Sequence, residues 1–227
     1  MFMSIRQPGG KIRCIASRRG FAGSYTIHAR SKLYASPAEA VADMKSNSTL
    51  LSGGFGLCGV PDTLIHAILE NKGVRDLTAV SNNAGVDGGG LGLLLGSGQV
   101  TKMVSSYIGD NKTFERMYLT GKMELDLTPQ GTLAERIRAG GAGVPAFFTP
   151  AGVGTIIESG EIPSRYNEDG TVQTYQKKKE SREFKGRRYI MEEAIAGDYA
   201  IVKAYRADKA GNLQFRLSAE NFNGAMA

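Results

Sequence analysis

Short apolar segments alternate with amphipathic ones along the first two thirds of the chain. Residues 49–51 and 77–81 are apolar-rich runs with the length of buried strands. Between them, residues 62–71 place aliphatic side chains on one face of a helix. A strand, a helix and a second strand in this order predict a βαβ unit with two parallel strands.

The same alternation continues on both sides of this unit. A Ser-Pro-Ala-Glu capping box at residues 36–39 opens a helix that ends near residue 45. A Thr-Leu-Ala-Glu box at residues 132–135 opens another, which ends at residues 140–141. Further strands are predicted at residues 102–107, 124–127 and 146–148, and further helices at residues 110–119 and within residues 88–98. We therefore expect an α/β fold, a mostly parallel sheet with helices on both faces.

The last third of the chain has a different character. Residues 159–187 are polar, and the charge run at residues 177–180 is typical of a solvated hairpin or loop. Residues 199–205 predict a strand that turns and pairs with residues 213–216 as an antiparallel hairpin near the C-terminus. Residues 221–227 contain no obvious closing element.

A glycine-rich stretch, residues 53–61, lies between the first predicted strand and its helix. Its four glycines allow a sharp turn and leave backbone N–H groups uncovered by side chains. Pro61 fits the first helical position, where its missing N–H costs nothing. Such N–H groups beside a helix start can hold an oxyanion, a carboxylate or a phosphate. The alternative is a tight connection without a ligand.

Two amides follow the second predicted strand. Asn82 and Asn83 would lie at its carboxyl end, where ligands bind in open α/β sheets. A carboxamide offers both donors and an acceptor to such a ligand. Asn and Gly are also common turn residues, so a plain turn is the alternative interpretation of residues 82–85.

Composition and charge narrow the class of protein. Apolar residues make up 41% and charged residues 22% of the 227 residues, as in ordinary globular proteins. Residues 1–34 hold seven of the 28 basic residues and no acidic one, so 21 basic and 22 acidic residues give residues 35–227 a net charge of −1. This near-neutral domain argues against a nucleic-acid partner. No apolar run approaches the roughly 20 residues that cross a membrane.

The basic first segment has the composition of a targeting sequence. Residues 1–34 are Arg-rich, contain Ser and lack acidic residues, as mitochondrial transit peptides do, and residues 19–22 resemble a matrix-peptidase cleavage site. A disordered basic tail is the alternative. We expect a transit peptide at residues 1–34, a folded domain at residues 35–227 and location in the mitochondrial matrix.

The glycine-rich stretch can also be interpreted as a dinucleotide-binding loop, a P-loop or the site of a cysteine nucleophile. Gly54, Gly56 and Gly59 match the dinucleotide pattern G-x-G-x-x-G, but Asp76 precedes the strand whose end should carry the ribose-binding acid. A P-loop is excluded because no Gly-Lys-Ser/Thr follows. Cys58 as a nucleophile needs a base, and a small packed side chain is the expected alternative.

Several motifs in a fixed order resemble the family I coenzyme A transferases. The resemblance is greatest to the amino-terminal, A-type half of the mitochondrial succinyl-CoA:3-ketoacid CoA transferase branch. It runs from about residue 33 to residue 227. The residues that carry it are 53–61, 81–85, 127–136, 140–146 and 221–223.

The resemblance implies a CoA transferase (3-oxoacid CoA-transferase) that moves CoA from succinyl-CoA to acetoacetate in ketone-body breakdown. A glutamate attacks the thioester, and an acyl anhydride and then a glutamyl-CoA thioester form. In this family the glutamate belongs to a B-type half with a Glu-Asn-Gly motif, which is absent here. The resemblance thus implies no catalytic nucleophile in this chain, a B-type partner and an oligomer, and an isolated chain without activity.

The same resemblance assigns a substrate site without a metal or a bound cofactor, the CoA thioester being the substrate. The sequence departs from the family pattern at Gly96–Gly98, where relatives have longer side chains. It also departs at its end, where relatives continue, so the domain at residues 35–227 is expected to be incomplete. Alternatives are a non-catalytic domain that binds a full-length partner, or a dinucleotide-binding domain. The predicted substrate-binding residues are Asn82, Asn83 and Gln130, with Gly54, Phe55, Gly56 and Gly59 of the glycine-rich stretch.

Overall fold

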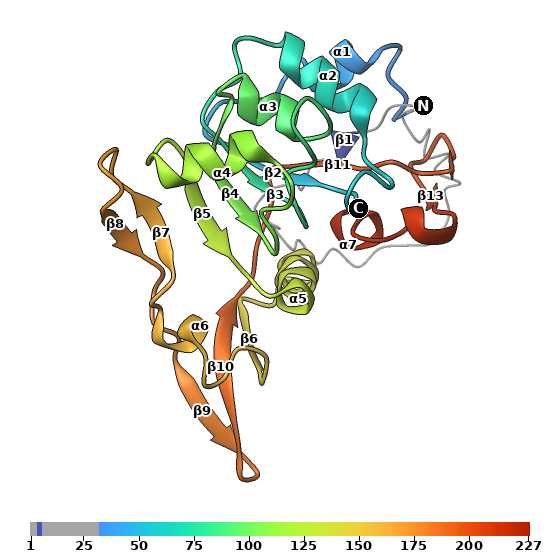
Figure 1. Ribbon diagram of the computed structural model, residues 1–227. Helices are drawn as coiled ribbons and strands as arrows, with labels where there is room; N and C mark the ends of the chain where they lie inside the picture. Colours follow the sequence, from blue (N-terminus) through green and yellow to red (C-terminus); the bar gives the residue numbers. More distant parts are fainter. Residues whose placement is uncertain (1–3, 6–31) are drawn as a thin grey trace, which may run out of the picture.

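The computed structural model describes residues 4–5 and 32–227. Its centre is a six-stranded sheet with the strand order β1-β11-β2-β3-β4-β5 (Figure 1). The strands from β11 to β5 run parallel, and β1 pairs antiparallel with β11. These strands are β1 (Ser4–Ile5), β2 (Thr49–Ser52), β3 (Leu77–Val80), β4 (Val100–Ser105), β5 (Glu124–Leu127) and β11 (Tyr199–Ile201). The predicted parallel sheet is confirmed.

Both faces of this sheet are covered by helices. Successive strand residues point to opposite faces, so Leu50 and Met103 belong to a core with α1 to α4, whereas Leu51 and Val104 belong to a core with α5 and α7. Burial on both faces explains why the strands appear as apolar runs. The helices are α1 (Pro37–Val41), α2 (Asp62–Glu70), α3 (Gly92–Gly96), α4 (Lys112–Leu119), α5 (Gln130–Gly141) and α7 (Asn223–Met226).

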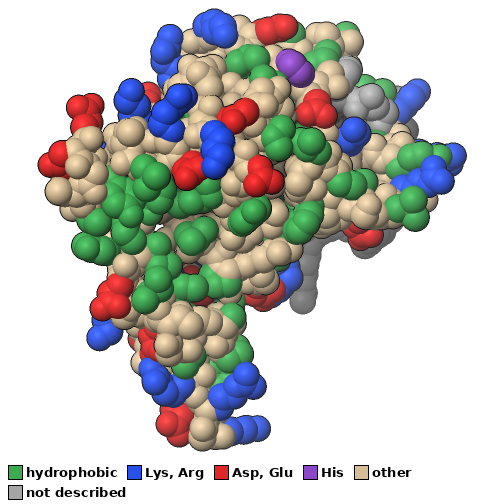
Figure 2. Space-filling model, viewed as in Figure 1, with side chains coloured by type: hydrophobic (Ala, Val, Ile, Leu, Met, Phe, Trp, Pro, Cys, Tyr) green, Lys and Arg blue, Asp and Glu red, His purple; other side chains and the backbone are tan. Residues whose placement is uncertain are grey.

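Antiparallel strands form an arm that projects from this α/β body (Figure 1). One sheet has the order β6-β10-β9, and β7 pairs with β8. Figure 2 shows basic and acidic side chains over the end of the arm, which agrees with the polar character of residues 159–187. The elements are β6 (Ala146–Thr149), α6 (Ile156–Ser159), β7 (Pro163–Tyr166), β8 (Val172–Tyr175), β9 (Ser181–Phe184) and β10 (Arg187–Glu193).

A buried ionic network joins the arm to the body. The Glu192 carboxylate on β10 is only 1% exposed and accepts a hydrogen bond from Lys179 Nζ at 2.9 Å. Arg136 Nε of α5 lies 3.9 Å from the same carboxylate, and Arg136 Nη1 lies 3.2 Å from Asp126 of β5. Lys179 is half-buried because it neutralises a buried carboxylate. The expectation of a solvated run at residues 177–180 is therefore wrong at this position.

Two predicted strands occupy other places than expected. β6 pairs antiparallel with β10 outside the main sheet, since its residues are only half-buried and suit an exposed ribbon. Tyr199–Ile201 is buried and joins the main sheet beside β2, so it is not part of the C-terminal hairpin. That hairpin is formed by β12 (Arg206–Ala207) and β13 (Leu213–Gln214).

The first helices begin close to where the sequence places them. Ser36 is the N-cap of α1, and its Oγ accepts from the N–H of Glu39 at 3.2 Å. The helix ends at Val41, earlier than expected, because the chain turns there before β2. Pro61 is the N-cap of α2 and not its first residue, and Asn111 is the N-cap of α4.

The predicted capping box at Thr132 is wrong. Helix α5 begins at Gln130 with Pro129 as N-cap, and the Pro129 carbonyl accepts from the Leu133 N–H at 2.8 Å. Thr132 therefore lies inside the first turn, not before it. Its Oγ1 is buried and has no hydrogen-bond partner among the described residues.

The end of the chain closes the second core. The 3₁₀ helix η1 (Leu217–Ala219) leads into α7, and Phe222 and Met226 pack in the core with α5. These two side chains are four residues apart and share one helical face. The expectation that residues 221–227 hold no closing element is therefore wrong; the pattern is too short to be recognised from the sequence.

Candidate functional site

The predicted site residues follow β2, β3 and β5 at the carboxyl edge of the parallel sheet. Hydrogen bonds tie the neighbouring strand ends together there. The Gly53 N–H donates to the Ile201 carbonyl at 3.0 Å, and Ser81 Oγ donates to the Ser52 carbonyl at 2.9 Å. The loops that carry the site thus start from a rigid row of strand ends.

The glycine loop, residues 53–59, forms a tight turn after β2. Phe55 and Cys58 exchange two backbone hydrogen bonds, both 3.0 Å long. Gly54, Gly56 and Gly59 have φ of 118°, 59° and 71°, which side-chain-bearing residues rarely adopt. The glycines are therefore required by the backbone path of the loop.

Only part of the loop backbone is available to a ligand. The N–H groups of Gly53, Phe55 and Cys58 already donate to backbone carbonyls. In the described part of the chain, no hydrogen bond uses the N–H of Gly54 or Gly56. The N–H groups of Leu57 and Gly59 have no acceptor among the described residues either, and of these four groups those of Gly54 and Gly56 belong to residues that line a small pocket, where an anion could accept from them.

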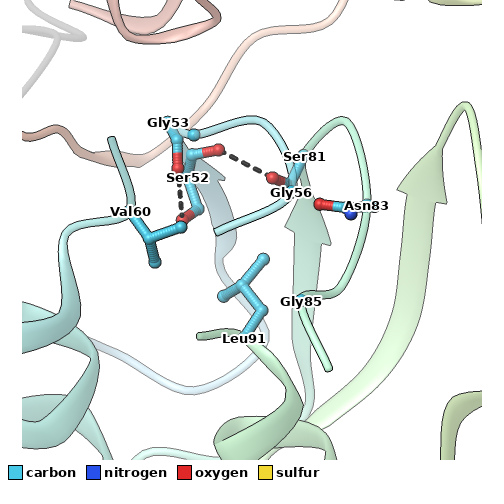
Figure 3. A pocket seen from close by; sticks show the side chains of 9 residues that line it. Ser52, Gly53, Gly56, Val60, Ser81, Asn83, Gly85 and Leu91 are labelled. Atoms are coloured by element: carbon cyan, nitrogen blue, oxygen red, sulfur yellow. Dashed lines mark hydrogen bonds between the residues drawn. The ribbon is translucent and has the colours of Figure 1, made fainter. Parts of the chain in front are cut away.

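A small pocket lies between the glycine loop and the turn after β3 (Figure 3). Its free volume of about 10 Å³ leaves room for about one water molecule. Figure 3 shows the Ser81–Ser52 hydrogen bond at its edge, with the Val60 and Leu91 side chains nearby. An acyl group would need a neighbouring surface or a movement of the loop. The lining residues are Ser52, Gly53, Gly54, Gly56, Val60, Ser81, Asn83, Gly85 and Leu91.

The two asparagines after β3 have different surroundings. Asn82 is 4% exposed, and its Oδ1 accepts from Ser106 Oγ at 2.8 Å. The Asn82 carbonyl also accepts from the Ser106 N–H at 3.1 Å, so Asn82 ties the end of β3 to the end of β4. Asn83 is half-buried and lines the small pocket with Gly54 and Gly56. The geometry thus brings Asn83, rather than Asn82, to the glycine loop.

Gln130 lies apart from this group. It is the exposed first residue of α5, directly after the β5 end. Strand β4 lies between β3 and β5, so Gln130 and Asn83 start from strands roughly 10 Å apart. Next to Gln130 is a groove of about 390 Å³ between the start of α5 and β6, which has the size of a small-ligand pocket. The groove is lined by Pro129, Gly131, Thr132, Glu135, Phe147, Phe148, Thr149 and Ala151.

The other two predicted residues lie at the tip and the base of the glycine loop. Phe55, at the tip, is 46% exposed, and Leu57 beside it is 61% exposed. Gly59 is buried at the base of the loop. The tip therefore presents apolar side chains to solvent, while the base packs against the body of the protein.

A second loop, residues 84–90, repeats the tight turn after β3. Val86 and Gly89 exchange backbone hydrogen bonds of 3.3 and 3.1 Å. The Asp87 carboxylate accepts from the N–H groups of Lys112 and Thr113 at the start of α4. Hydrogen bonds from the Thr113 backbone and side chain hold the pKa of Asp87 below its usual range. This loop is thus fixed to the start of a helix.

Two residues that sequence reasoning did not assign to the site hold the glycine loop. Asn221 Nδ2 donates to the Cys58 carbonyl at 3.1 Å, and Asn223 Nδ2 donates to the Gly59 carbonyl at 2.9 Å. Residues 221–223 carry part of the family resemblance, which was the available signal. Their role depends on a contact across more than 160 residues, which no local pattern reveals.

The competing chemical interpretations fit the structure less well. Cys58 is exposed, with its Sγ 3.5 Å from Ser218 Oγ, so the expectation of a packed side chain is wrong; the turn points it outward. Asp76 lies before β3, at the amino end of the strand and away from the glycine loop. The acid that a dinucleotide-binding site needs at the end of that strand is not supplied by Asp76.

Residues 4–5 and 32–227 contain neither a membrane-spanning helix nor a cluster of metal ligands. No helix among them has the length and apolar character needed to cross a bilayer. No group of three or more His, Cys, Asp or Glu side chains in this part of the chain is placed to hold a metal ion.

Comparison with known proteins places this geometry in a family. The family described as coenzyme A transferase matches residues 34–227. The chain is 54% identical over 193 residues to mouse succinyl-CoA:3-ketoacid coenzyme A transferase 2A, mitochondrial, which covers 85% of this chain and 37% of the mouse protein. It is 52% identical over 200 residues to the A-type subunit of the succinyl-CoA:3-ketoacid coenzyme A transferase of Xanthomonas campestris pv. campestris (strain B100), covering 88% of this chain and 75% of that protein.

A solved structure agrees with these sequence relatives. The apoenzyme of an acyl-CoA transferase from Escherichia coli O157:H7 matches with a TM-score of 0.69 at 25% identity, over 83% of this chain and 37% of that one. The chain spans little more than a third of the length of the mammalian relatives it matches. The match over residues 34–227 and the high identity together show that the chain belongs to the coenzyme A transferase family.

Proposed function

We propose that this chain is the A-type half of a succinyl-CoA:3-oxoacid CoA transferase, which moves CoA from succinyl-CoA to acetoacetate. The observation that carries the proposal is the pairing of the glycine loop with the turn after β3 at adjacent strand ends, in a chain of this family. The names of the mouse and Xanthomonas relatives support the succinyl-CoA and 3-ketoacid substrates.

The proposed reaction needs a carboxylate nucleophile. A glutamate carboxylate attacks the thioester carbonyl, the C–S bond breaks, and CoA leaves as thiolate while an acyl-glutamyl anhydride remains. The thiolate then attacks the glutamyl carbonyl, succinate leaves, and a glutamyl-CoA thioester forms. Acetoacetate takes the CoA by the reverse path. Because this chain has no Glu-Asn-Gly motif, we assign the glutamate to a B-type half.

The residues of this chain would bind and orient the acyl group. Gly54, Gly56 and Asn83 line one pocket, where the two glycine N–H groups and the Asn83 carboxamide could donate to a carboxylate or a developing oxyanion. Gln130 could donate from the start of α5, beside the groove. In this proposal Asn82, Phe55 and Gly59 frame the site, and neither a metal nor a bound cofactor takes part.

Exposed apolar side chains support a partner at the same edge. Phe55 and Leu57 project from the glycine loop, Val86 from the second loop, and Tyr107 from the segment after β4. A Cβ at Gly89 would lie 3.2 Å from Val86 and 4.0 Å from Leu57, so the two loop tips adjoin. Such apolar surfaces mark association sites. We propose that a B-type half covers them in an oligomer.

We further propose that the protein acts in the mitochondrial matrix. The mouse and human relatives are named as mitochondrial, and residues 1–34 have the composition of a transit peptide. Of this segment, only Ser4–Ile5 and residues 32–34 lie among the described residues. Amino-terminal sequencing of the mature protein tests this; a mature protein that begins at Met1 would contradict a cleaved transit peptide.

Reconstitution with a B-type half tests the function. The mixed halves should form acetoacetyl-CoA from succinyl-CoA and acetoacetate, and Gln130→Ala should lower turnover about 100-fold with little change in melting temperature, because one oxyanion donor is lost from an exposed position. Gln173→Ala, on the exposed arm, is the matched control and should retain turnover. Absence of activity with a competent B-type half would favour a non-catalytic binding domain instead.

A further inference from the structure

We propose that Asn223, supported by Asn221, is a positioning residue that sets the shape of the glycine loop, residues 53–59. The inference rests on the proposed function, since the loop shape matters for catalysis only if the loop binds the acyl group. The Asn223 side chain lies beneath the loop, and its hydrogen bonds reach three separate segments of the chain.

The hydrogen bonds of Asn223 fix both ends of its carboxamide. Its Nδ2 donates to the Gly59 carbonyl at 2.9 Å and to the Ala219 carbonyl at 2.8 Å. Its Oδ1 accepts from the Lys203 N–H at 2.9 Å, just after β11. Asn223 is fully buried, so loss of the side chain would leave buried backbone groups without partners. The carboxamide thus links the loop base to the main sheet.

Asn221 adds a second, more exposed bond. Its Nδ2 donates to the Cys58 carbonyl at 3.1 Å and to the Ser218 carbonyl at 2.9 Å. Its Oδ1 is 3.3 Å from Asn223 Nδ2, so the two carboxamides form one connected group. Successive carbonyls of the loop, those of Cys58 and Gly59, are therefore held by the two asparagines of the terminal segment.

Direct packing reinforces these hydrogen bonds. A Cβ on Gly53 would overlap Asn223 Oδ1, and a Cβ on Gly59 would lie 2.8 Å from Asn223 Nδ2 and 2.9 Å from the Ala219 carbonyl. Both ends of the loop therefore rest on the Asn223 carboxamide. The loop tip has no such support: a Cβ on Gly56 would meet nothing within 4 Å.

The consequence is a loop with a clamped base and a free tip. The N–H of Gly54 lies next to the base and that of Gly56 at the tip, so the direction of both groups depends on how the base is held. Displacing donors by about 1 Å can lower turnover about 100-fold. Asn223 would then act through the loop and without touching the substrate.

Steady-state kinetics of the reconstituted enzyme tests the inference. Asn223→Ala should lower kcat about 10- to 100-fold, with less than about a twofold change in the KM for succinyl-CoA, because misdirected donors weaken the transition state more than binding. Gly224→Ala is the matched control: its Cβ would meet only Glu220 at ordinary contact distance, and its kinetics should match the parent enzyme. An unchanged kcat for Asn223→Ala would overturn the inference.

Hydrogen exchange supplies a readout that needs no activity. In the chain alone, Asn223→Ala should speed amide exchange at residues 53–59 at least several-fold and leave residues 84–90 unchanged. If the substitution changes the exchange rate equally at residues 53–59 and 84–90, the inference that Asn223 holds the glycine loop is wrong. If the parent halves show no transferase activity, the proposed function fails, while the exchange result still decides whether Asn223 holds the loop.

Asn221→Ala covers the case in which Asn223→Ala does not fold, and a double-mutant cycle of Gly53 and Asn223 adds a test of packing where it does fold. Asn221→Ala removes the bonds to the Cys58 and Ser218 carbonyls and the contact with Asn223 Nδ2, and it should speed exchange at the Cys58 N–H without unfolding the chain. Gly53→Ala should be tolerated better with Asn223→Ala than with Asn223 present, because the overlapping Oδ1 and Cγ atoms are gone. If the effects of Gly53→Ala and Asn223→Ala on the free energy of unfolding are strictly additive, the loop does not pack directly on Asn223.

Discussion

The two tight loops at the carboxyl edge are built alike but held differently. Each follows a parallel strand and is closed by a reciprocal pair of backbone hydrogen bonds, Phe55 with Cys58 and Val86 with Gly89. Each also receives a bond from a buried asparagine at a helix start. Asn223 Nδ2 donates to the Gly59 carbonyl at 2.9 Å, and Asn111 Nδ2 donates to the Ala84 carbonyl at 3.2 Å.

The difference is the distance along the chain. Asn111 lies 27 residues after Ala84 and also caps α4, so the second loop is fixed by nearby structure. Asn223 lies 164 residues after Gly59, so the glycine loop is fixed only when the end of the chain has folded back onto the sheet. The loop that we assign to substrate binding therefore depends on the remote segment, and the other does not.

The largest expected effect is a loss of stability on substituting a glycine of the second loop, which should exceed the loss for a glycine of the first. Gly85→Ala should lower the free energy of unfolding by about 3 kcal/mol, because φ is +68° and the new Cβ would lie 2.5 Å from the Gly89 carbonyl oxygen. Gly56→Ala should cost about 1 kcal/mol, since only its positive φ opposes the change. Urea unfolding of both variants measures the difference, and equal losses would contradict this account of loop packing.

Substitution of Asn111, which holds the second loop, should have the next largest effect on the free energy of unfolding. Asn111→Ala removes the cap bond to the Phe114 N–H and leaves the Ala84 carbonyl without its donor, so we expect a loss of about 2 kcal/mol in unfolding free energy. Asn167→Ala, in the exposed β7–β8 turn, is the control and should cost under about 0.5 kcal/mol. Amide exchange should rise in residues 84–90 and at Phe114, which loses its cap bond, but not in the glycine loop. A rise in the glycine loop would mean that Asn111 and Asn223 do not act independently.

The smallest expected effect concerns Asp87 and depends on pH. Hydrogen bonds from Thr113 lower the pKa of Asp87 below 3.8, so the charged carboxylate stabilises the folded state above that pH and the benefit is lost as pH falls through the lowered pKa. Asp87→Asn should therefore melt slightly below the parent chain at pH 7, and the gap should close in acid. A gap that stays constant from pH 7 to below pH 3.8 would rule out this role.

Much of the fold follows from local patterns. The strands from β2 to β5 and helices α2 and α4 are within a few residues of their predicted places, because burial on both faces leaves continuous apolar runs and clear helix faces. The place of β6 and β11 could not be derived in this way. Their sheet partners, β10 and β2, are far away in sequence, and pairing over such distances leaves no periodic signal.

The candidate site shows the same division. The glycine loop and the turn after β3 are local features, and their meeting at adjacent strand ends follows from the βαβ unit. The burial of Asn82 against Ser106 and the clamp by Asn223 were not predictable, because each depends on a side chain from another segment. Thr132 was misassigned because a capping-box pattern cannot show that Gln130 already begins the helix.

The location of the nucleophile is the central claim, and covalent trapping tests it most directly. Two samples should be incubated with succinyl-CoA: the chain alone, and the chain mixed with a B-type half. Both are then treated with borohydride, and reduced residues are mapped by peptide mass spectrometry. We predict no reduced glutamate in the chain alone, and in the mixture one reduced residue, the glutamate of the Glu-Asn-Gly motif in the B-type half. A reduced glutamate within residues 35–227, together with turnover by the chain alone, would contradict the account.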